Sequence, residues 1–224
     1  MVKRLTKTEF GNPLPRETAK VLSELEILSS DVQILIADMY EALENRKSGV
    51  GIAAPQVGHS LAINVIDTKP TKTRPDLTRQ KLTIINPVIT KTYGRRKPMW
   101  EACLSGPDLY AQVPRYKKVR LRWQDEQAMK HEEDFDGFIA HVIQHEVDHL
   151  HGILFVDKVK DTKTYMTTKE FKKYAKAEQS KWYTLGIMQN NVKALIIEYM
   201  QEQKLMQLAT VGDDGPWVCS LWQA

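Results

Sequence analysis

The stretch Gln144-His145-Glu146-Val147-Asp148-His149-Leu150 decides which fold and which chemistry to look for. It contains His-Glu-x-x-His, and on an α-helix His149 returns to within about 40° of His145, one turn along. Two imidazoles on one helix face can bind one metal ion, and Glu146 is placed to reach a water bound to that metal. The alternative is a charged surface helix with this spacing by chance. A third ligand elsewhere in the chain would decide between them.

The residues around this stretch favour a helix. Asp136 is a plausible N-cap, and Gly152 supplies a stop. Between them, apolar residues recur at helical spacing and predict a buried stripe; these are Phe138, Ile139, Val142, Ile143, Val147 and Leu150.

Composition indicates an ordinary soluble globular protein. The chain has 224 residues, of which 42% are hydrophobic and 27% charged, and no apolar run reaches the roughly 18 residues of a membrane span. Residues 1–7 lack the apolar core of a secretory signal. With only Cys103 and Cys219, no disulfide framework is implied, so we expect a cytoplasmic protein without a membrane partner.

Two features lie in the first 60 residues. Ser30-Asp31-Val32-Gln33 is typical of a capping box, and the helix after it is expected to run to about Glu44 with a core stripe; the stripe is Val32, Leu35, Ile36, Met39 and Leu43. Gly49–Gly58 contains three glycines and two adjacent alanines, which lets the backbone come close to another group. The alternative is a tight connection. A phosphate loop is disfavoured because no Lys-Ser/Thr follows the glycines.

The rest of the chain predicts mainly strands. We expect strands at 61–66, at 82–85 (stopped by Asn86-Pro87), at 88–93 and at 153–156, with a basic turn at 94–98. Because that turn has no aromatic series for stacking bases, a solvated loop is favoured over a nucleic-acid site. Val119, Leu121 and Trp123 alternate with basic residues, as in a half-buried strand. The expected fold class is α+β, with mostly antiparallel strands around a central metal-binding helix and a C-terminal helix and hairpin extension.

Cys103 is the remaining candidate for chemistry. A lone cysteine is usually a small buried hydrophobic residue. Here it follows Glu101 in a segment bounded by Pro98 and Pro107.

Three segments together resemble the signature motifs of peptide deformylases. The family patterns are Gly-x-Gly-Leu-Ala-Ala-x-Gln, Glu-Gly-Cys-Leu-Ser and Gln-His-Glu-x-Asp-His-Leu, and they match, in order and approximate spacing, the segments that begin at Gly49, Glu101 and Gln144. The likeness covers residues 5–175. It also takes in Asn86-Pro87, Val113-Pro114-Arg115 and Leu154-Phe155-Val156-Asp157.

The resemblance implies one divalent metal ion held by Cys103, His145 and His149. Such a set leaves the fourth position open for water, as in catalytic sites. Family members work best with ferrous iron and often carry zinc or nickel. The resemblance therefore implies Fe²⁺ in the cell, with Zn²⁺ or Ni²⁺ as alternatives.

The implied reaction removes the N-formyl group from the initiator methionine of nascent peptides and releases formate. By resemblance, Glu146 accepts a proton from water and later delivers it to the leaving amine. The Gln56 side-chain amide and the Leu104 backbone N–H would donate to the oxyanion that forms as water attacks.

Further roles follow from the same resemblance. Gly51 would let the backbone approach the substrate peptide, and Val50 and Val142 would line the methionine pocket. Tyr110 falls where some bacterial members place an arginine that holds the substrate backbone. Two more residues, Glu101 and Gln144, look like supports that fix the loop and the ligands. Asp148 is expected to hold structure.

The chain departs from the family pattern in places. Ala102 replaces a usual glycine, and if that position needs a positive φ, its methyl group costs on the order of 1 kcal/mol or more. Gly106 replaces a usual Val or Ile. His141 lies one turn before His145 and is expected to be a pocket or surface residue, with a spare metal contact as the less favoured alternative.

The tail is expected to form an extension at 176–224, after a catalytic domain at 1–175. Between Asp157 and Lys181 there are eight lysines and four acidic residues. This basic segment predicts either ribosome docking, through attraction to ribosomal RNA, or a solvated helix face. Residues 191–224 weakly resemble the opening helix and hairpin of flavin-binding split barrels, but the sequence stops before a barrel could close, so no flavin site is expected.

Two rival functions are compatible with parts of the pattern. A zinc peptidase is disfavoured, because its third ligand is expected downstream of the helix, whereas Cys103 lies upstream. The other rival is a catalytically weak, ribosome-associated deformylase homologue that kept its metal site; Ala102, Gly106 and Tyr110 are the residues that favour it. Neither reading includes sequence-specific nucleic-acid binding.

Overall fold

The computed structural model describes residue 5 and residues 7–45, 49–70, 77–177, 208–212 and 215–219. It forms two compact units, Met1–Lys169 and Glu170–Ala224. The sequence-based boundary after residue 175 stays a prediction. The opening helix expected within residues 191–224, before the hairpin, lies outside the described residues.

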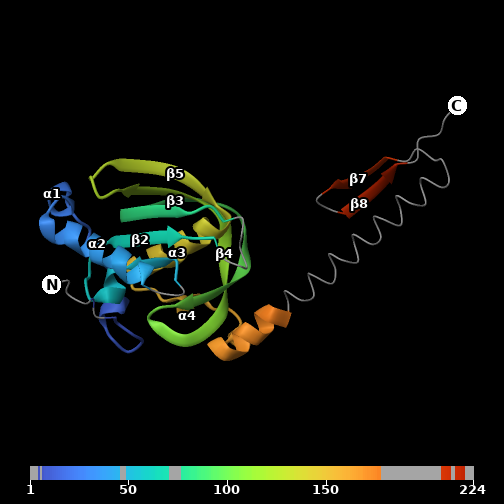
Figure 1. Ribbon diagram of the computed structural model, residues 1–224, viewed down its shortest axis with the longest axis horizontal. Coiled ribbons are helices and arrows are strands. Elements are labelled where there is room, and N and C mark those ends of the chain that lie inside the picture. Colours follow the sequence, from blue (N-terminus) through green and yellow to red (C-terminus); the bar gives the residue numbers. More distant parts are fainter. Residues whose placement is uncertain are drawn as a thin grey trace. The chain divides into compact units, whose positions relative to one another are not determined.

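An antiparallel sheet organises the first unit (Figure 1). Its strand order is β1-β2-β3-β4-β5, and the short β6 pairs with β4. All of these pairings are antiparallel, and helices pack against the sheet, which confirms the α+β class. The strands are β1 (Gly51–Ala53), β2 (Ile63–Thr68), β3 (Gln80–Cys103), β4 (Gly106–Gln124), β5 (Lys130–Asp136) and β6 (Met166–Thr167).

The helical segments include two that cover the sheet, α2 (Ser30–Glu44) and α3 (Gly137–Leu150). The others are short. They are the 3₁₀ turns η1 (Leu14–Arg16), η2 (Ala54–Val57) and η3 (Thr162–Thr164) and the helices α1 (Glu24–Ile27) and α4 (Phe155–Lys158). Residues 168–177 are also helical, in agreement with the helix expected there. None of the described helices is both long enough and apolar enough to cross a membrane.

The core lies on both faces of the sheet because side chains alternate along each strand. Ile63 and Val65 of β2 pack in one cluster with the buried stripe of α2. Ile66 and Ile84 pack on the other face, in a second cluster with α3. All five residues of the predicted α2 stripe are buried. Apolar burial thus packs α3 against the sheet.

The ends of α3 are set by local geometry. Asp136 has the extended N-cap conformation, although its side chain makes no capping hydrogen bond within the described part of the chain. At the other end Gly152 has φ +71°, and a Cβ atom there would lie 2.2 Å from the Arg16 carbonyl oxygen. A glycine is therefore required both for the turn and for the close approach of η1. The predicted stop is confirmed.

The prediction that Asn86-Pro87 ends a strand is wrong. Asn86 has φ +51° and produces a register shift, after which β3 continues to Cys103. Its side chain is held by long-range contacts: Nδ2 donates to the Leu22 carbonyl oxygen (2.8 Å) and to Gln124 Oε1 (2.9 Å), while Oδ1 accepts from Leu22 N–H (2.9 Å). These contacts turn a potential break into a bulge.

Three smaller expectations are also corrected. The segment 94–98 is part of β3, with a bulge after Tyr93, rather than a turn between strands. Residues 153–156 are not a strand, since α4 begins at Phe155 and the Asp157 carboxylate accepts from Leu154 N–H. The cap of α2 is Ser29, whose hydroxyl accepts from Val32 N–H, rather than Ser30.

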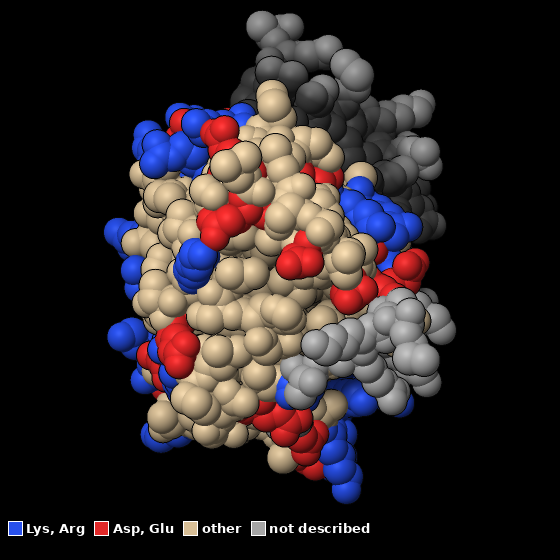
Figure 2. Space-filling view, turned by 90° about the vertical axis from the view of Figure 1, so that its left-hand side faces the viewer, with Lys and Arg blue, Asp and Glu red and all other residues tan. Residues whose placement is uncertain are grey.

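The surface of one face and the C-terminal extension complete the fold. On the side that carries α1 and α2, acidic and basic side chains are interspersed around a largely uncharged centre (Figure 2). In the second unit, β7 (Leu208–Gly212) and β8 (Gly215–Cys219) pair antiparallel, which confirms the predicted hairpin.

Candidate metal centre

Two elements bring the predicted metal ligands together. Cys103 is the last residue of β3 and pairs with Gly106 of β4, so Leu104 and Ser105 form the tight connection between the strands. His145 and His149 project from α3 toward this connection. Cys103 Sγ lies 3.3 Å from His149 Nε2, which lies 3.1 Å from His145 Nε2. The three potential ligand atoms lie within 4.8 Å of one another, so the group could hold one metal ion.

The charges in this cluster suit a cation. Burial would raise the pKa of the Cys103 thiol, but the neighbouring His149 and His145 outweigh it and hold that pKa well below its ordinary value. This lowered pKa favours the thiolate, the form that binds metals. One thiolate and two imidazoles form the donor set of an open catalytic site, which leaves a divalent ion with net positive charge.

Glu101 orients one of these histidines. Its Oε2 lies 2.8 Å from His145 Nδ1, which leaves Nε2 directed at the cluster. A carboxylate in this position is the usual partner of a metal-binding imidazole. Arg115 in turn donates to Glu101 (Nε to Oε1, 2.6 Å) and to Asp148 (Nη1 to Oδ2, 2.6 Å). Asp148 is thus part of a buried ion network, in keeping with a structural role.

Gln56 lies beside the thiolate. Its Oε1 accepts from Ala53 N–H (2.9 Å), which fixes the amide so that Nε2 lies 3.2 Å from Cys103 Sγ and 3.4 Å from Ser105 Oγ. Leu104 belongs to the same β3–β4 connection. An amide N–H donor therefore sits at the edge of the cluster, where a developing oxyanion could be stabilised.

Glu146 follows the potential ligand His145 on α3 and is buried against β1. A Cβ atom at Gly51 would lie 2.5 Å from Glu146 Oε1, so the carboxylate packs directly on the β1 backbone. Its Oε2 has no hydrogen-bond partner among the described residues. Burial raises the pKa of Glu146, although the neighbouring His145 and His149 act in the opposite direction. This raised pKa is what a proton acceptor and donor needs near neutral pH.

The predicted substrate-binding residues lie on or beside α3, β1 and β4. Val142 of α3 and the partly buried Val50, beside β1, pack in the same apolar cluster. Tyr110 of β4 pairs with Ala102 of β3, and burial raises the pKa of its hydroxyl, so it stays protonated. The Gln144 side chain bonds the backbone N–H and carbonyl of Tyr116 (3.0 and 2.8 Å) and so ties α3 to β4. Its role as a support for the ligands stays a prediction.

Comparison with known proteins agrees with this geometry. The sequence model of the polypeptide deformylase family matches residues 8–165. The chain belongs to the polypeptide deformylase family. It is 40% identical over 161 residues to the peptide deformylase of Leptospira biflexa, covering 70% of this chain and 88% of that protein. It is 43% identical over 154 residues to that of Cytophaga hutchinsonii, covering 69% and 81%.

Solved deformylase structures share the fold. The class I type b peptide deformylase of Acinetobacter baumannii, in its crystal structure with Met-Ala-Ser, superposes with a TM-score of 0.67 at 34% identity. The match covers 71% of this chain and 100% of the Acinetobacter chain. The deformylase fold is therefore complete within this chain.

Two departures from the deformylase pattern have a structural explanation. Ala102 lies in the extended part of β3 and is not among the positive-φ residues, so its methyl group causes no backbone strain. At Gly106, a Cβ atom would lie 2.4 Å from the ring of Phe10, whose N–H donates to the Ser105 carbonyl oxygen (2.9 Å). An aromatic ring from the N-terminal segment thus occupies the space of the usual branched side chain.

The third departure, His141, was only partly anticipated. It is buried, so a surface position is wrong, and it lies outside the group of potential metal ligands. Its Nε2 lies 2.8 Å from Glu101 Oε1. The sequence places His141 one turn from His145 on α3, but its partner is 40 residues away on β3.

Proposed function

We propose that this chain is a metal-dependent peptide deformylase. It hydrolyses the N-formyl group from the initiator methionine of nascent polypeptides and releases formate. The observation that carries this function is the convergence of Cys103, His145 and His149, with Gln56 beside the sulfur and Glu146 buried against the β1 backbone. Family membership supports the same reaction.

The residues present fit one divalent metal ion. We propose Cys103, His145 and His149 as its ligands, because the thiolate form of the sulfur and the Glu101 contact to His145 both favour binding of a cation. When bound, the ion would polarise the formyl carbonyl and lower the pKa of water. We propose Fe²⁺ as the ion in the cell, with Zn²⁺ and Ni²⁺ as alternatives that the same donors accept.

The proton transfers fall to Glu146. We propose that its carboxylate accepts a proton from the attacking water and then delivers it to the amine nitrogen as the C–N bond breaks. Gln56 Nε2–H and the Leu104 backbone N–H would donate to the oxygen of the formyl group, on which negative charge develops. Removal of either donor acts on the transition state more than on the bound substrate.

The substrate groups have plausible partners near the cluster. We propose that Val50 and Val142 line the pocket for the methionine side chain and that Gly51 lets the peptide backbone approach. We propose that Tyr110, on β4, contacts the backbone of the substrate peptide. The crystal structure of the Acinetobacter enzyme with Met-Ala-Ser supports a peptide that begins with methionine.

The catalytic unit is assigned to residues 1–175, with 176–224 as an extension. The basic segment from Asp157 to Lys181 supports a further proposal, that this region is attracted to ribosomal RNA where nascent chains emerge. Residues beyond 177 in this segment lie outside the described part of the chain. Nascent polypeptides as substrates place the proposed activity in the cytoplasm.

The function is tested with three peptides that differ only at the amino terminus: formyl-Met-Ala-Ser, acetyl-Met-Ala-Ser and Met-Ala-Ser. Protein loaded anaerobically with Fe²⁺ is expected to release formate and a free amine from the first peptide alone. Cleavage of the peptide bonds, with or without formate, would favour the zinc-peptidase alternative. Absence of turnover on all three would favour the catalytically weak homologue.

A further inference from the structure

Helix α3 carries three histidines at four-residue spacing, His141, His145 and His149, on one face. The second and third are the proposed metal ligands. The first is buried and has a different partner, since His141 Nε2 lies 2.8 Å from Glu101 Oε1. His145 Nδ1 lies 2.8 Å from the other oxygen of the same carboxylate, Oε2. Glu101 therefore bridges two histidines that are one helical turn apart.

The direction of these hydrogen bonds is determined by the carboxylate. Arg115 donates to both oxygens of Glu101 (Nε to Oε1, 2.6 Å; Nη2 to Oε2, 3.1 Å), the bidentate pairing of a guanidinium with an ionised carboxylate. An ionised carboxylate only accepts hydrogen bonds. His141 Nε2 and His145 Nδ1 are therefore the donors, and His145 Nε2 is left to face the cluster.

The contacts of Glu101 divide between the sheet and the helix. Arg115 lies on β4, next to β3, and donates to both Glu101 oxygens (2.6 and 3.1 Å), which ties the carboxylate to the sheet. Arg115 also donates to Asp148, so its position is shared between two acids. Among the hydrogen bonds of the described residues, those that tie Glu101 to α3 come from His145 itself and from His141. Arg115 reaches α3 only through Asp148, whereas the His141 contact joins α3 to the Glu101 carboxylate directly and involves no proposed ligand.

We propose that His141 is a positioning residue for the metal centre: by holding Glu101 Oε1, it presents Oε2 to His145 and so fixes the ring orientation of that ligand. This inference rests on the proposed function only through the metal site. Removal of a residue that supports a metal ligand in this way typically weakens metal affinity by about 10–100-fold. His141 also packs edge-on against Phe138, with ring centroids 6.3 Å apart, so the test must separate the hydrogen bond from packing.

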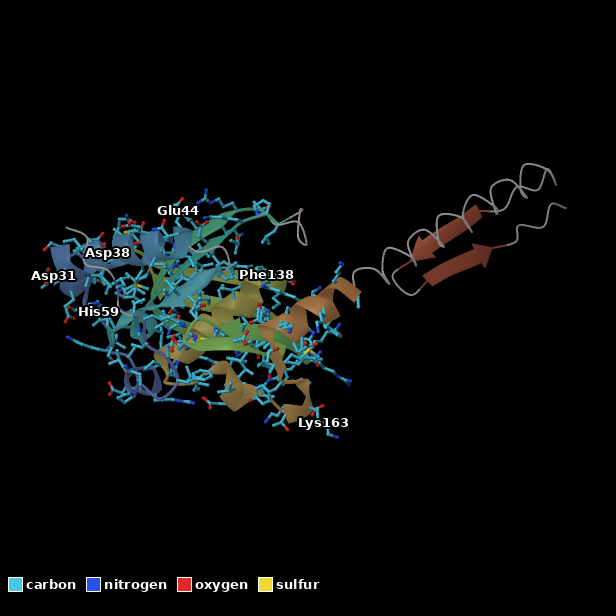
Figure 3. All side chains as sticks on the ribbon, turned by 60° about the horizontal axis from the view of Figure 1, so that its bottom comes forward. Asp31, Asp38, Glu44, His59, Phe138 and Lys163 are labelled. Carbon is cyan, nitrogen blue, oxygen red and sulfur yellow. The ribbon has the colours of Figure 1, made fainter. Side chains whose placement is uncertain are left out.

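Two substitutions make this separation. In His141→Gln, the side-chain amide nitrogen can take the place of Nε2 and keep a donor to Glu101. In His141→Met, a side chain of similar length fills the space but has no donor. His59→Gln is the matched control, because His59 is exposed and lies toward the end of the unit that carries Asp31 and Asp38, away from Phe138 (Figure 3).

The measurement is the dissociation constant for Co²⁺, determined by chelator competition and followed through the thiolate-to-cobalt absorption of the metal-loaded protein. We expect His141→Met to weaken binding by about tenfold or more and to shift the cobalt ligand-field bands. His141→Gln should stay within about threefold of wild type, and His59→Gln should be unchanged. Thermal unfolding of the metal-free proteins serves as the control for folding.

Two results would overturn the proposal: an unchanged dissociation constant and spectrum for His141→Met, or a His141→Gln protein as weak as His141→Met. Should His141→Met not fold, His141→Asn replaces it. The shorter Asn side chain cannot place its amide nitrogen where Nε2 lies, so it cannot donate to Glu101, and the same weakening of Co²⁺ binding is expected. Wild-type protein that binds no Co²⁺ would contradict the proposed metal centre itself, which is a separate result.

Discussion

The carboxylate of Glu146 occupies the space that a side chain at Gly51 would need. A Cβ atom at position 51 would lie 2.5 Å from Oε1, 2.8 Å from Cδ and 2.9 Å from Cγ of Glu146. The absence of a side chain at the second glycine of the Gly49–Gly58 segment therefore leaves room for the proposed proton carrier. Because β1 and α3 are both packed in the core, neither can retreat to relieve such a contact.

Gly51→Ala is expected to lower kcat strongly. Displacement of a catalytic group by about 1 Å can cost on the order of 100-fold in rate, and overpacking typically costs about 1–3 kcal/mol of stability. Steady-state kinetics and denaturant unfolding measure the two effects. In a Glu146→Ala background the same substitution should cost little stability, because its partner is gone. Full activity of Gly51→Ala would show that the carboxylate does not need its observed position.

Gln56 permits a test of the proposed oxyanion donor that leaves its fixing contact in place. Gln56→Glu keeps an oxygen that can accept from Ala53 N–H but loses the N–H donor, and Gln56→Ala loses both. We expect both to lower kcat by about 100–1000-fold, with much smaller changes in KM. A drop in kcat for Gln56→Ala without one for Gln56→Glu would assign the residue to loop structure instead.

The contact between Phe10 and Gly106 predicts compensation between two segments far apart in sequence. Gly106→Val should destabilise the protein by about 1 kcal/mol, the low end of overpacking costs, because the new side chain meets the Phe10 ring and that ring is 40% exposed and can shift. In Phe10→Ala, the same change at position 106 should cost less or become favourable. A double-mutant cycle from unfolding free energies measures this coupling, and additive effects would be evidence against it.

Glu101 predicts how the stability of the metal-free protein depends on pH. Because the folded-state pKa of Glu101 lies below its ordinary value of 4.5, the stabilisation is present above about pH 4.5 and is lost as the pH falls below it. The unfolded state then binds more protons, so the contribution declines by at most about 1.4 kcal/mol per pH unit. Unfolding free energies of wild type and Glu101→Gln between pH 3 and pH 6 should converge toward low pH. Parallel curves would mean that the carboxylate is not ionised in the fold.

Local sequence patterns predicted those parts of the fold that depend on neighbouring residues. The α3 helix and its stop at Gly152, the stripe of α2 and the alternation in β4 follow from periodicity and backbone preference, and the structure confirms them. The prediction that Cys103 and His145 share one metal site came from the family motifs, because no local sequence pattern links residues that far apart.

The errors have long-range causes. Asn86-Pro87 looks like a break, and it remains within β3 because the Asn86 side chain bonds Leu22 and Gln124. Burial of His141 on Glu101 depends on how α3 packs against the sheet. Gly106 is explained by a ring nearly 100 residues earlier in the chain. In each case the deciding partner is far away in sequence, so the residue alone carries no signal of it.

The central claim is that the Cys103-His145-His149 cluster, with Glu146 as proton carrier, removes formyl groups from peptides. The most direct test compares formate release from formyl-Met-Ala-Ser by wild type and Glu146→Ala, both loaded anaerobically with Fe²⁺ and assayed for bound metal. We predict turnover by wild type, and about 100–10,000-fold less by Glu146→Ala at equal metal content. No formate from wild type with one metal bound per chain, or equal turnover by the variant, would contradict the account.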